Sequence, residues 1–106
     1  KNLSYGQRKL LEIARVLTML EAKNINLVLF DEPFAGLFPE MVKLVEGIIK
    51  ELRTQNKAVV LIEHNMDIIR ELCDYLYVLD AGKLLAEGAP HEVLNRRDVL
   101  EAYLGE

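Results

Sequence analysis

The sequence predicts an α/β fold in which parallel strands alternate with crossover helices, followed by a C-terminal β-hairpin and short helices. Two short apolar runs, residues 27–31 and 58–64, are typical of strands buried on both faces. A helical pattern of apolar residues separates them over residues 40–54. This strand–helix–strand order indicates a right-handed crossover and therefore a parallel pair of strands.

Composition and charge narrow the class of protein. The 106 residues suffice for one small domain, and 51% hydrophobic with 28% charged residues is ordinary for a soluble globular protein. The net charge of −4 argues against a generic binder of nucleic acids or anionic membranes. The single cysteine, Cys73, excludes an internal disulfide, suits a reducing cytosolic setting and is expected to be a buried core thiol. No apolar run is long enough to span a membrane, and no signal peptide is visible. The start at Lys1 rather than methionine suggests that the sequence is a trimmed or excised piece of a longer chain.

The first predicted helix covers residues 5–22. Ser4 and Gln7 have the spacing of a capping box, which begins a helix. The free N–H groups and positive dipole at this start can hold an anion, and Gly6 leaves room for the close approach of a ligand. The alternative is a plain capped helix without a ligand. Its apolar residues recur at helical spacing: Leu10, Ile13, Ala14, Leu17 and Leu20.

Two adjacent carboxylates, Asp31 and Glu32, lie at the carboxyl end of the first strand. Pro33 ends that strand because proline has no N–H to donate to a ladder. In open α/β sheets, ligands bind at this carboxyl edge. Adjacent carboxylates repel each other and need a cation, a donor or water. The alternative is a strand that ends in solvent with two exposed acids.

The second strand also ends in polar residues, Glu63 and His64. Because parallel strands end at the same edge of a sheet, we expect His64 to lie beside Asp31 and Glu32. The alternative is an ordinary hydrogen-bonded histidine. Between the strands, Gly36 is the expected pivot of a loop, and the helix over residues 40–54 has a wide apolar face: Met41, Val42, Leu44, Val45, Ile48, Ile49 and Leu52.

The remaining chain predicts shorter elements. Asn65 caps a short helix with Met66, Ile69, Leu72 and Cys73 facing inward. The elements after it are a strand over residues 75–79, a hairpin turn over 80–83, a strand over 83–87, and helices over 90–95 and 97–104 with Gly105 behind them. His91 is expected to be exposed.

An anion-ready helix start, an acid pair and a histidine, in this order, resemble the ATPase subunit of ABC transporters. Residues 3–7, Leu-Ser-Tyr-Gly-Gln, resemble the signature motif, and residues 27–32 resemble the Walker B strand with its catalytic glutamate. Residues 35–38 occupy the D-loop, and His64 is the switch histidine. The resemblance spans essentially the whole chain, and four motifs in the right order are specific. It implies a partial P-loop NTPase-type fold.

The tail resembles one branch of this family. Residues 80–83, 87–93 and 101–105 are similar to the branched-chain amino acid importer ATPases, with the lipopolysaccharide-export ATPase a near second. An ABC-type ATPase of chromosome maintenance or DNA repair is a further alternative, although such proteins usually attach coiled coils. A non-catalytic interaction module derived from the fold is the alternative from another class.

The resemblance also implies roles and ligands, with ATP and Mg²⁺ as cofactors. Asp31 would hold Mg²⁺ mostly through water, Glu32 would polarise the attacking water, and His64 would contact the γ-phosphate. The signature residues would cap the γ-phosphate of ATP bound to a second, head-to-tail subunit: Ser4, Tyr5, Gly6 and Gln7. The D-loop residues would cross the dimer interface: Ala35, Gly36, Leu37 and Phe38.

Two residues depart from the family pattern. Tyr5 stands where glycine is usual in the signature, and its side chain either crowds the phosphate or points away. Phe38 stands where many members have aspartate, which removes a polar group from the D-loop.

No Gly-x-x-x-x-Gly-Lys-[Ser/Thr] loop occurs in the sequence. We therefore interpret residues 1–106 as the C-terminal half of an ABC-type ATPase domain. The expected partners are the missing N-terminal half, a second ATPase subunit and transmembrane permease subunits, without nucleic acid. The expected location is cytoplasmic, peripheral at the inner face of the membrane. The fragment alone is expected not to hydrolyse ATP, and its exposed apolar edges are expected to make it oligomerise, swap elements or rearrange.

Overall fold

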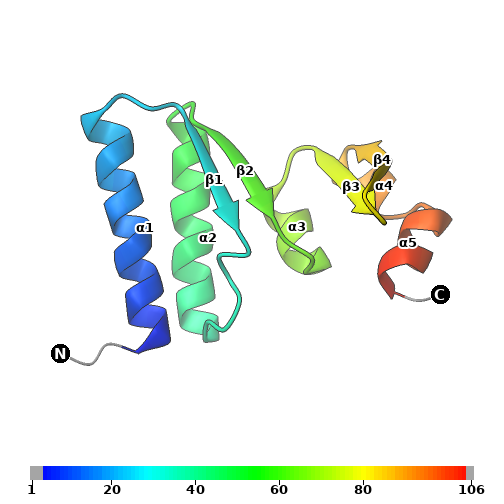
Figure 1. Ribbon diagram of the computed structural model, residues 1–106, viewed down its shortest axis with the longest axis horizontal. Coiled ribbons are helices and arrows are strands. Elements are labelled where there is room, and N and C mark those ends of the chain that lie inside the picture. The colour runs from blue at the N-terminus through cyan, green and yellow to red at the C-terminus, as the bar shows by residue number, and fades with distance from the viewer. Residues whose placement is uncertain (1–3, 105–106) are drawn as a thin grey trace. The chain divides into compact units, whose positions relative to one another are not determined.

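The computed structural model describes residues 4–104 (Figure 1). The chain divides into two compact units, of which the first ends at Glu63 and the second begins at His64. The described residues alternate helices and strands as the sequence predicts, and each unit contains a two-stranded sheet of its own.

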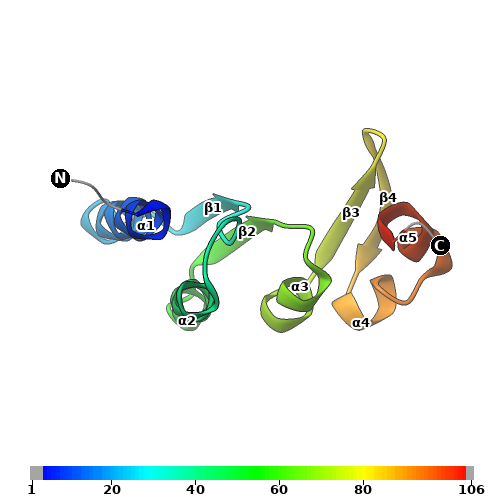
Figure 2. The same cartoon turned by 90° about the horizontal axis from the view of Figure 1, so that it is seen from below.

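The first unit contains a parallel β-strand pair with two long helices. Its elements are α1 (Tyr5–Ala22), β1 (Leu27–Asp31), α2 (Pro39–Thr54) and β2 (Ala58–Ile62). β1 pairs in parallel with β2, with Leu27 opposite Ala58 and Asp31 opposite Ile62. Helix α2 lies along one face of this sheet, and α1 runs beside α2 (Figures 1 and 2). The predicted crossover and parallel pair are confirmed.

The prediction that both strands are buried on both faces is wrong. Val28 and Phe30 are buried, but Leu27 and Leu29 on the other face are 59% and 61% exposed. Val60 and Ile62 of β2 are exposed as well. In the described part of the chain, helices cover only one face of the sheet, so alternate residues of each strand remain open to solvent.

The buried faces of α1 and α2 are narrower than their apolar patterns. In α1, Ile13 and Leu20 of the apolar pattern are buried, but Ala14 is exposed. In α2 the buried residues are Val45, Ile49 and Leu52, whereas Leu44 is 56% exposed. Part of each helical apolar pattern is therefore exposed, as are the outer residues of the strands.

The second unit packs short helices against an antiparallel hairpin. Its elements are α3 (Met66–Leu72), β3 (Leu76–Asp80), β4 (Lys83–Gly88), α4 (Pro90–Val93) and α5 (Arg97–Leu104). Its core consists of Ile69, Leu76, Val78, Ala86, Val93, Leu94 and Val99. Cys73 packs against this core but is half-buried, so the expectation of a fully buried thiol is wrong. His91 is exposed, as expected.

Local signals place the boundaries of these elements. The side-chain oxygen of Asn65 accepts hydrogen bonds from the N–H groups of Asp67 (3.0 Å) and Ile68 (3.3 Å), which confirms the predicted cap of α3. At the hairpin, Ala81 and Gly82 have φ angles of 50° and 76°, as a two-residue type I′ turn requires. Among the residues described, no helix has the length and apolar character needed to cross a membrane.

Candidate functional site

The acid pair and the end of β2 lie at one edge of the sheet. Asp31 is opposite Ile62 in the parallel register. The backbone N–H of Glu32 continues the ladder and donates a 2.8 Å hydrogen bond to the carbonyl oxygen of Ile62. The expectation that both strands end at the same edge is therefore confirmed.

Glu32 has an unusual backbone conformation. Its φ angle of 48° lies in the left-handed region, which non-glycine residues rarely adopt. The neighbouring Pro33 is buried, and the carbonyl oxygen of Glu32 accepts a 3.3 Å hydrogen bond from the N–H of Ala35. Asp31 is exposed, whereas Glu32 is half-buried. Unfavourable backbone conformations of this kind concentrate at functional sites, where the surrounding structure maintains them.

The predicted capping box at the start of α1 is confirmed. The Ser4 hydroxyl oxygen accepts a 3.1 Å hydrogen bond from the N–H of Gln7, and the Gln7 side-chain oxygen accepts a 2.9 Å bond from the N–H of Ser4. An α-helix leaves the other N–H groups of its first turn without an intrahelical acceptor. The helix start is thus fixed in a geometry that can receive an anion.

The space beside Gly6 is filled by this chain itself. Gly6 is buried, and a Cβ atom built on it would lie 2.1 Å from the Met41 sulfur. The missing side chain of Gly6 thus makes room for Met41 at the start of α2, and the approach of a ligand to the Gly6 backbone stays a prediction. Within the first unit the ring of Tyr5 lies against Gly36, and whether it would crowd a phosphate stays a prediction.

The loop between β1 and α2 carries the predicted D-loop residues. Phe34 is buried (6% exposed) and anchors the loop, while Ala35 and Gly36 are exposed and Leu37 is half-buried. Phe38 is 73% exposed and precedes Pro39 at the start of α2. The loop therefore presents an apolar aromatic side chain to solvent at the position where the family often has an acid.

His64 is exposed and follows the end of β2 by two residues. It is the first residue of the second compact unit. Its position beside Asp31 and Glu32 stays a prediction.

Two side chains near the predicted site were missed from the sequence. The Lys9 ammonium lies 5.6 Å from the centre of the Tyr5 ring, and Met41 fills the space beside Gly6. The i, i+4 spacing of Tyr5 and Lys9 was a signal for the first contact. Nothing in the sequence indicates the second contact, because it joins two helices.

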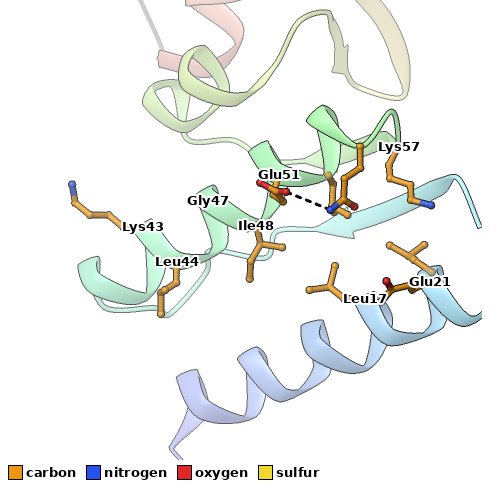
Figure 3. Close-up of a pocket in the computed structure, with 11 residues that line it drawn as sticks. Leu17, Glu21, Lys43, Leu44, Gly47, Ile48, Glu51 and Lys57 are labelled. Atoms are coloured by element: carbon orange, nitrogen blue, oxygen red, sulfur yellow. Dashed lines mark hydrogen bonds between the residues drawn. The ribbon is translucent and has the colours of Figure 1, made fainter.

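A separate groove of about 730 Å³ lies between α1 and α2 (Figure 3). Its central residues are apolar, and its charged rim includes Lys57, which donates hydrogen bonds to the Ile25 carbonyl oxygen (2.7 Å) and the Asn26 side chain (3.2 Å). None of the predicted site residues lines it. Its lining residues are Leu17, Leu20, Glu21, Lys43, Leu44, Gly47, Ile48, Glu51, Leu52, Gln55 and Lys57.

Comparisons with known proteins agree with this geometry. The chain is 42% identical over 106 residues to the high-affinity branched-chain amino acid transport ATP-binding protein LivG of Salmonella typhimurium, covering 99% of this chain and 40% of that protein. It is 40% identical to the lipopolysaccharide export system ATP-binding protein LptB of Haemophilus influenzae, covering 98% of this chain and 42% of that protein. The chain thus spans about 40% of the length of these curated relatives.

Structural and family comparisons give the same result. The fold matches a crystal structure of the ADP conformation of MJ1267, an ATP-binding cassette of an ABC transporter, with a TM-score of 0.80 and 36% identity. That match covers 99% of this chain and 41% of the solved chain. A family model described as "Branched-chain amino acid ATP-binding cassette transporter" matches residues 83–106. The predicted partial ABC ATPase fold is therefore confirmed.

Proposed function

We propose that the chain is part of an ABC transporter ATP-binding protein and supplies the water-activating edge of an ATPase domain that drives transport. One observation supports this proposal most strongly: the sheet ends in Asp31 and Glu32, and Glu32 is held in a left-handed conformation against the end of β2. Such an arrangement fixes a carboxylate where a ligand of an α/β sheet binds.

Glu32, His64 and the start of α1 have separate proposed roles. The Glu32 carboxylate orients the attacking water and accepts a proton from it. His64 donates a hydrogen bond to the γ-phosphate. The start of α1 faces the γ-phosphate of ATP on a second, head-to-tail subunit, and the loop at Gly36 lies at that dimer interface.

Asp31 is the proposed residue for Mg²⁺. Its carboxylate is exposed at the end of β1, and Mg²⁺ in phosphoryl-transfer sites is usually held by one or two carboxylates together with waters and substrate phosphates. Within residues 4–104 no group of three or more His, Cys, Asp or Glu side chains could hold a metal ion. When bound, the ion would neutralise charge on the transferred phosphoryl group.

Branched-chain amino acid import is the proposed transport process. The support is the 42% identity to an ATP-binding protein of that system and the family match over residues 83–106. Lipopolysaccharide export is the second candidate, supported by 40% identity to a protein of that system. In either case we propose permease subunits as partners and a cytoplasmic location at the inner face of the membrane.

Nucleotide titration tests this proposal. The 106-residue chain is titrated with ATP and Mg²⁺ alone and after mixing with the remaining part of the Salmonella relative, which the chain does not match. We expect binding only in the mixture. Absence of binding in both cases would overturn the proposal in favour of a non-catalytic interaction module.

A further inference from the structure

The ring of Tyr5 lies against Gly36, the pivot of the loop after Glu32. A Cβ atom built on Gly36 would lie 3.0 Å from Cε2 of the Tyr5 ring and 3.4 Å from Cδ2. The shorter distance is tighter than most carbon contacts, so a side chain at residue 36 would make the ring shift by a few tenths of an ångström. The φ of 76° is the stronger reason for glycine, because other residues are strained in this conformation.

The two residues that flank Gly36 link it to Glu32 through backbone hydrogen bonds. The N–H of Ala35 donates to the carbonyl oxygen of Glu32 (3.3 Å), and the N–H of Leu37 donates to that of Phe34 (3.2 Å). Two successive turns therefore connect the contact at Gly36 with the left-handed backbone of Glu32. Any displacement of Gly36 would loosen the hydrogen bond that closes the turn at Glu32.

The Tyr5 ring is itself held in place from the helix side. The capping box of Ser4 and Gln7 fixes the first turn of α1, and the Lys9 ammonium lies over the ring at 5.6 Å from its centre. One residue further on, Gly6 is packed against Met41 at the start of α2. The starts of α1 and α2 therefore lie close together (Figure 1).

We propose that Tyr5 is a positioning residue for this loop: its aromatic ring holds Gly36 and thereby maintains the backbone conformation of Glu32. The ring is the group that both Gly36 and Lys9 contact, so phenylalanine should replace tyrosine and leucine should not. An effect of Tyr5 on ATP hydrolysis rests on the proposed function. The contact between Tyr5 and Gly36 and the conformation of the loop do not.

The test compares the full 106-residue chain with Y5F, Y5L and the control Y77L. Tyr77 is 68% exposed and belongs to the other compact unit, so its loss should not affect the loop. Nuclear magnetic resonance measures the ring-current shift of the Gly36 α protons and the hydrogen exchange of the Ala35 and Leu37 amides. The Ile49 amide, in the buried core of α2, reports unfolding of the whole first unit.

We expect the Gly36 α protons to show a ring-current shift in the wild type, Y5F and Y77L. This shift should be absent in Y5L. Exchange at Ala35 and Leu37 should accelerate about 5-fold or more in Y5L, with Ile49 unchanged, because only the loop opens. Equal Gly36 shifts in Y5L and the wild type would overturn the proposal, as would a Y5F variant that behaves like Y5L. Equal acceleration at Ile49 would also contradict it, since Tyr5 would then stabilise the whole unit. None of these readouts needs nucleotide, so failure of the proposed function is distinguishable.

Discussion

The N–H of Glu32 donates a 2.8 Å hydrogen bond to the carbonyl oxygen of Ile62, which ties the acid pair at the end of β1 to the last residue of β2. This bond is the physical link between the parallel pair and the proposed chemistry. It extends the ladder one residue past β1 and sets the point where the chain turns into its left-handed conformation. The chain that continues from Ile62 reaches His64 two residues later.

The uncovered face of the first sheet predicts self-association. Leu29 and Val60 are neighbours in register and are 61% and 49% exposed. Among the strands described, β2 pairs only with β1, so its other edge can accept a further strand. We expect the isolated chain to sediment as an oligomer and L29K to shift it toward the monomer. L11K, at an exposed leucine of α1, is the control. A well-folded, monomeric wild-type chain would contradict this prediction.

Two helical glycines should respond oppositely to alanine. A Cβ on Gly6 would lie 2.1 Å from the Met41 sulfur, which belongs to the end of a flexible side chain and can shift, so we expect G6A to destabilise the first unit by at most about 1 kcal/mol. Gly47, inside α2, has no atom within 4 Å of its Cβ position, and G47A should stabilise by about 0.5–1 kcal/mol. Denaturant unfolding measures both changes.

A double-mutant cycle identifies the cause of the G6A effect. If the clash with Met41 is responsible, the double variant G6A/M41A should lose less stability than the sum of the two single variants. Additive losses, or a stabilising G6A, would contradict the packing of α1 against α2 at this point.

Tyr75 gives a pH dependence in the second unit. Its hydroxyl donates a 2.9 Å hydrogen bond to Glu87, and this bond, followed by desolvation and the Glu87 charge, raises the pKa of Tyr75 above 10.0. A raised pKa in the folded state means that the stabilisation is complete below the unfolded pKa and is lost as the pH rises through the folded pKa. The stability difference between the wild type and Y75F should therefore be constant below pH 10.0 and shrink above it.

Chemical denaturation on either side of that pH measures the difference, and Y77F is the matched control. The Tyr77 ring packs edge-on against Tyr75, but its own hydroxyl is not the one that bonds to Glu87. If the stability difference between the wild type and Y75F grew with rising pH, the predicted direction of the pH dependence would be wrong.

The order and type of the elements could be predicted from the sequence because periodicity, caps and turns are local properties. The Ser4 capping box, the Asn65 cap and the Ala81–Gly82 turn were all found in this way. The burial of the strand residues could not be predicted, because the apolar sequences of β1 and β2 would be the same whether helices cover one face of the sheet or both. Their exposed residues became evident only from the arrangement of the helices.

The candidate site was predicted less completely than the fold. The identity of Asp31 and Glu32 followed from their position after an apolar run, but no sequence signal indicates that a glutamate adopts a positive φ. The Tyr5–Gly36 contact joins residues far apart in the chain, so the direction of the ring stayed open until the structure was known. The place of His64 beside the acids stays a prediction.

The central claim, that Glu32 activates water for ATP hydrolysis, is tested most directly by the turnover of a chimera in which residues 1–106 replace the matching 40% of the Salmonella relative. E32Q should lower ATP turnover by about 100-fold or more while ATP binding persists, because the general base is lost and the charge repelling phosphate is removed. E12Q, at an exposed glutamate of α1, is the control and should hydrolyse ATP at the rate of the unsubstituted chimera. An E32Q chimera that turns over ATP as fast as the E12Q control would contradict the account.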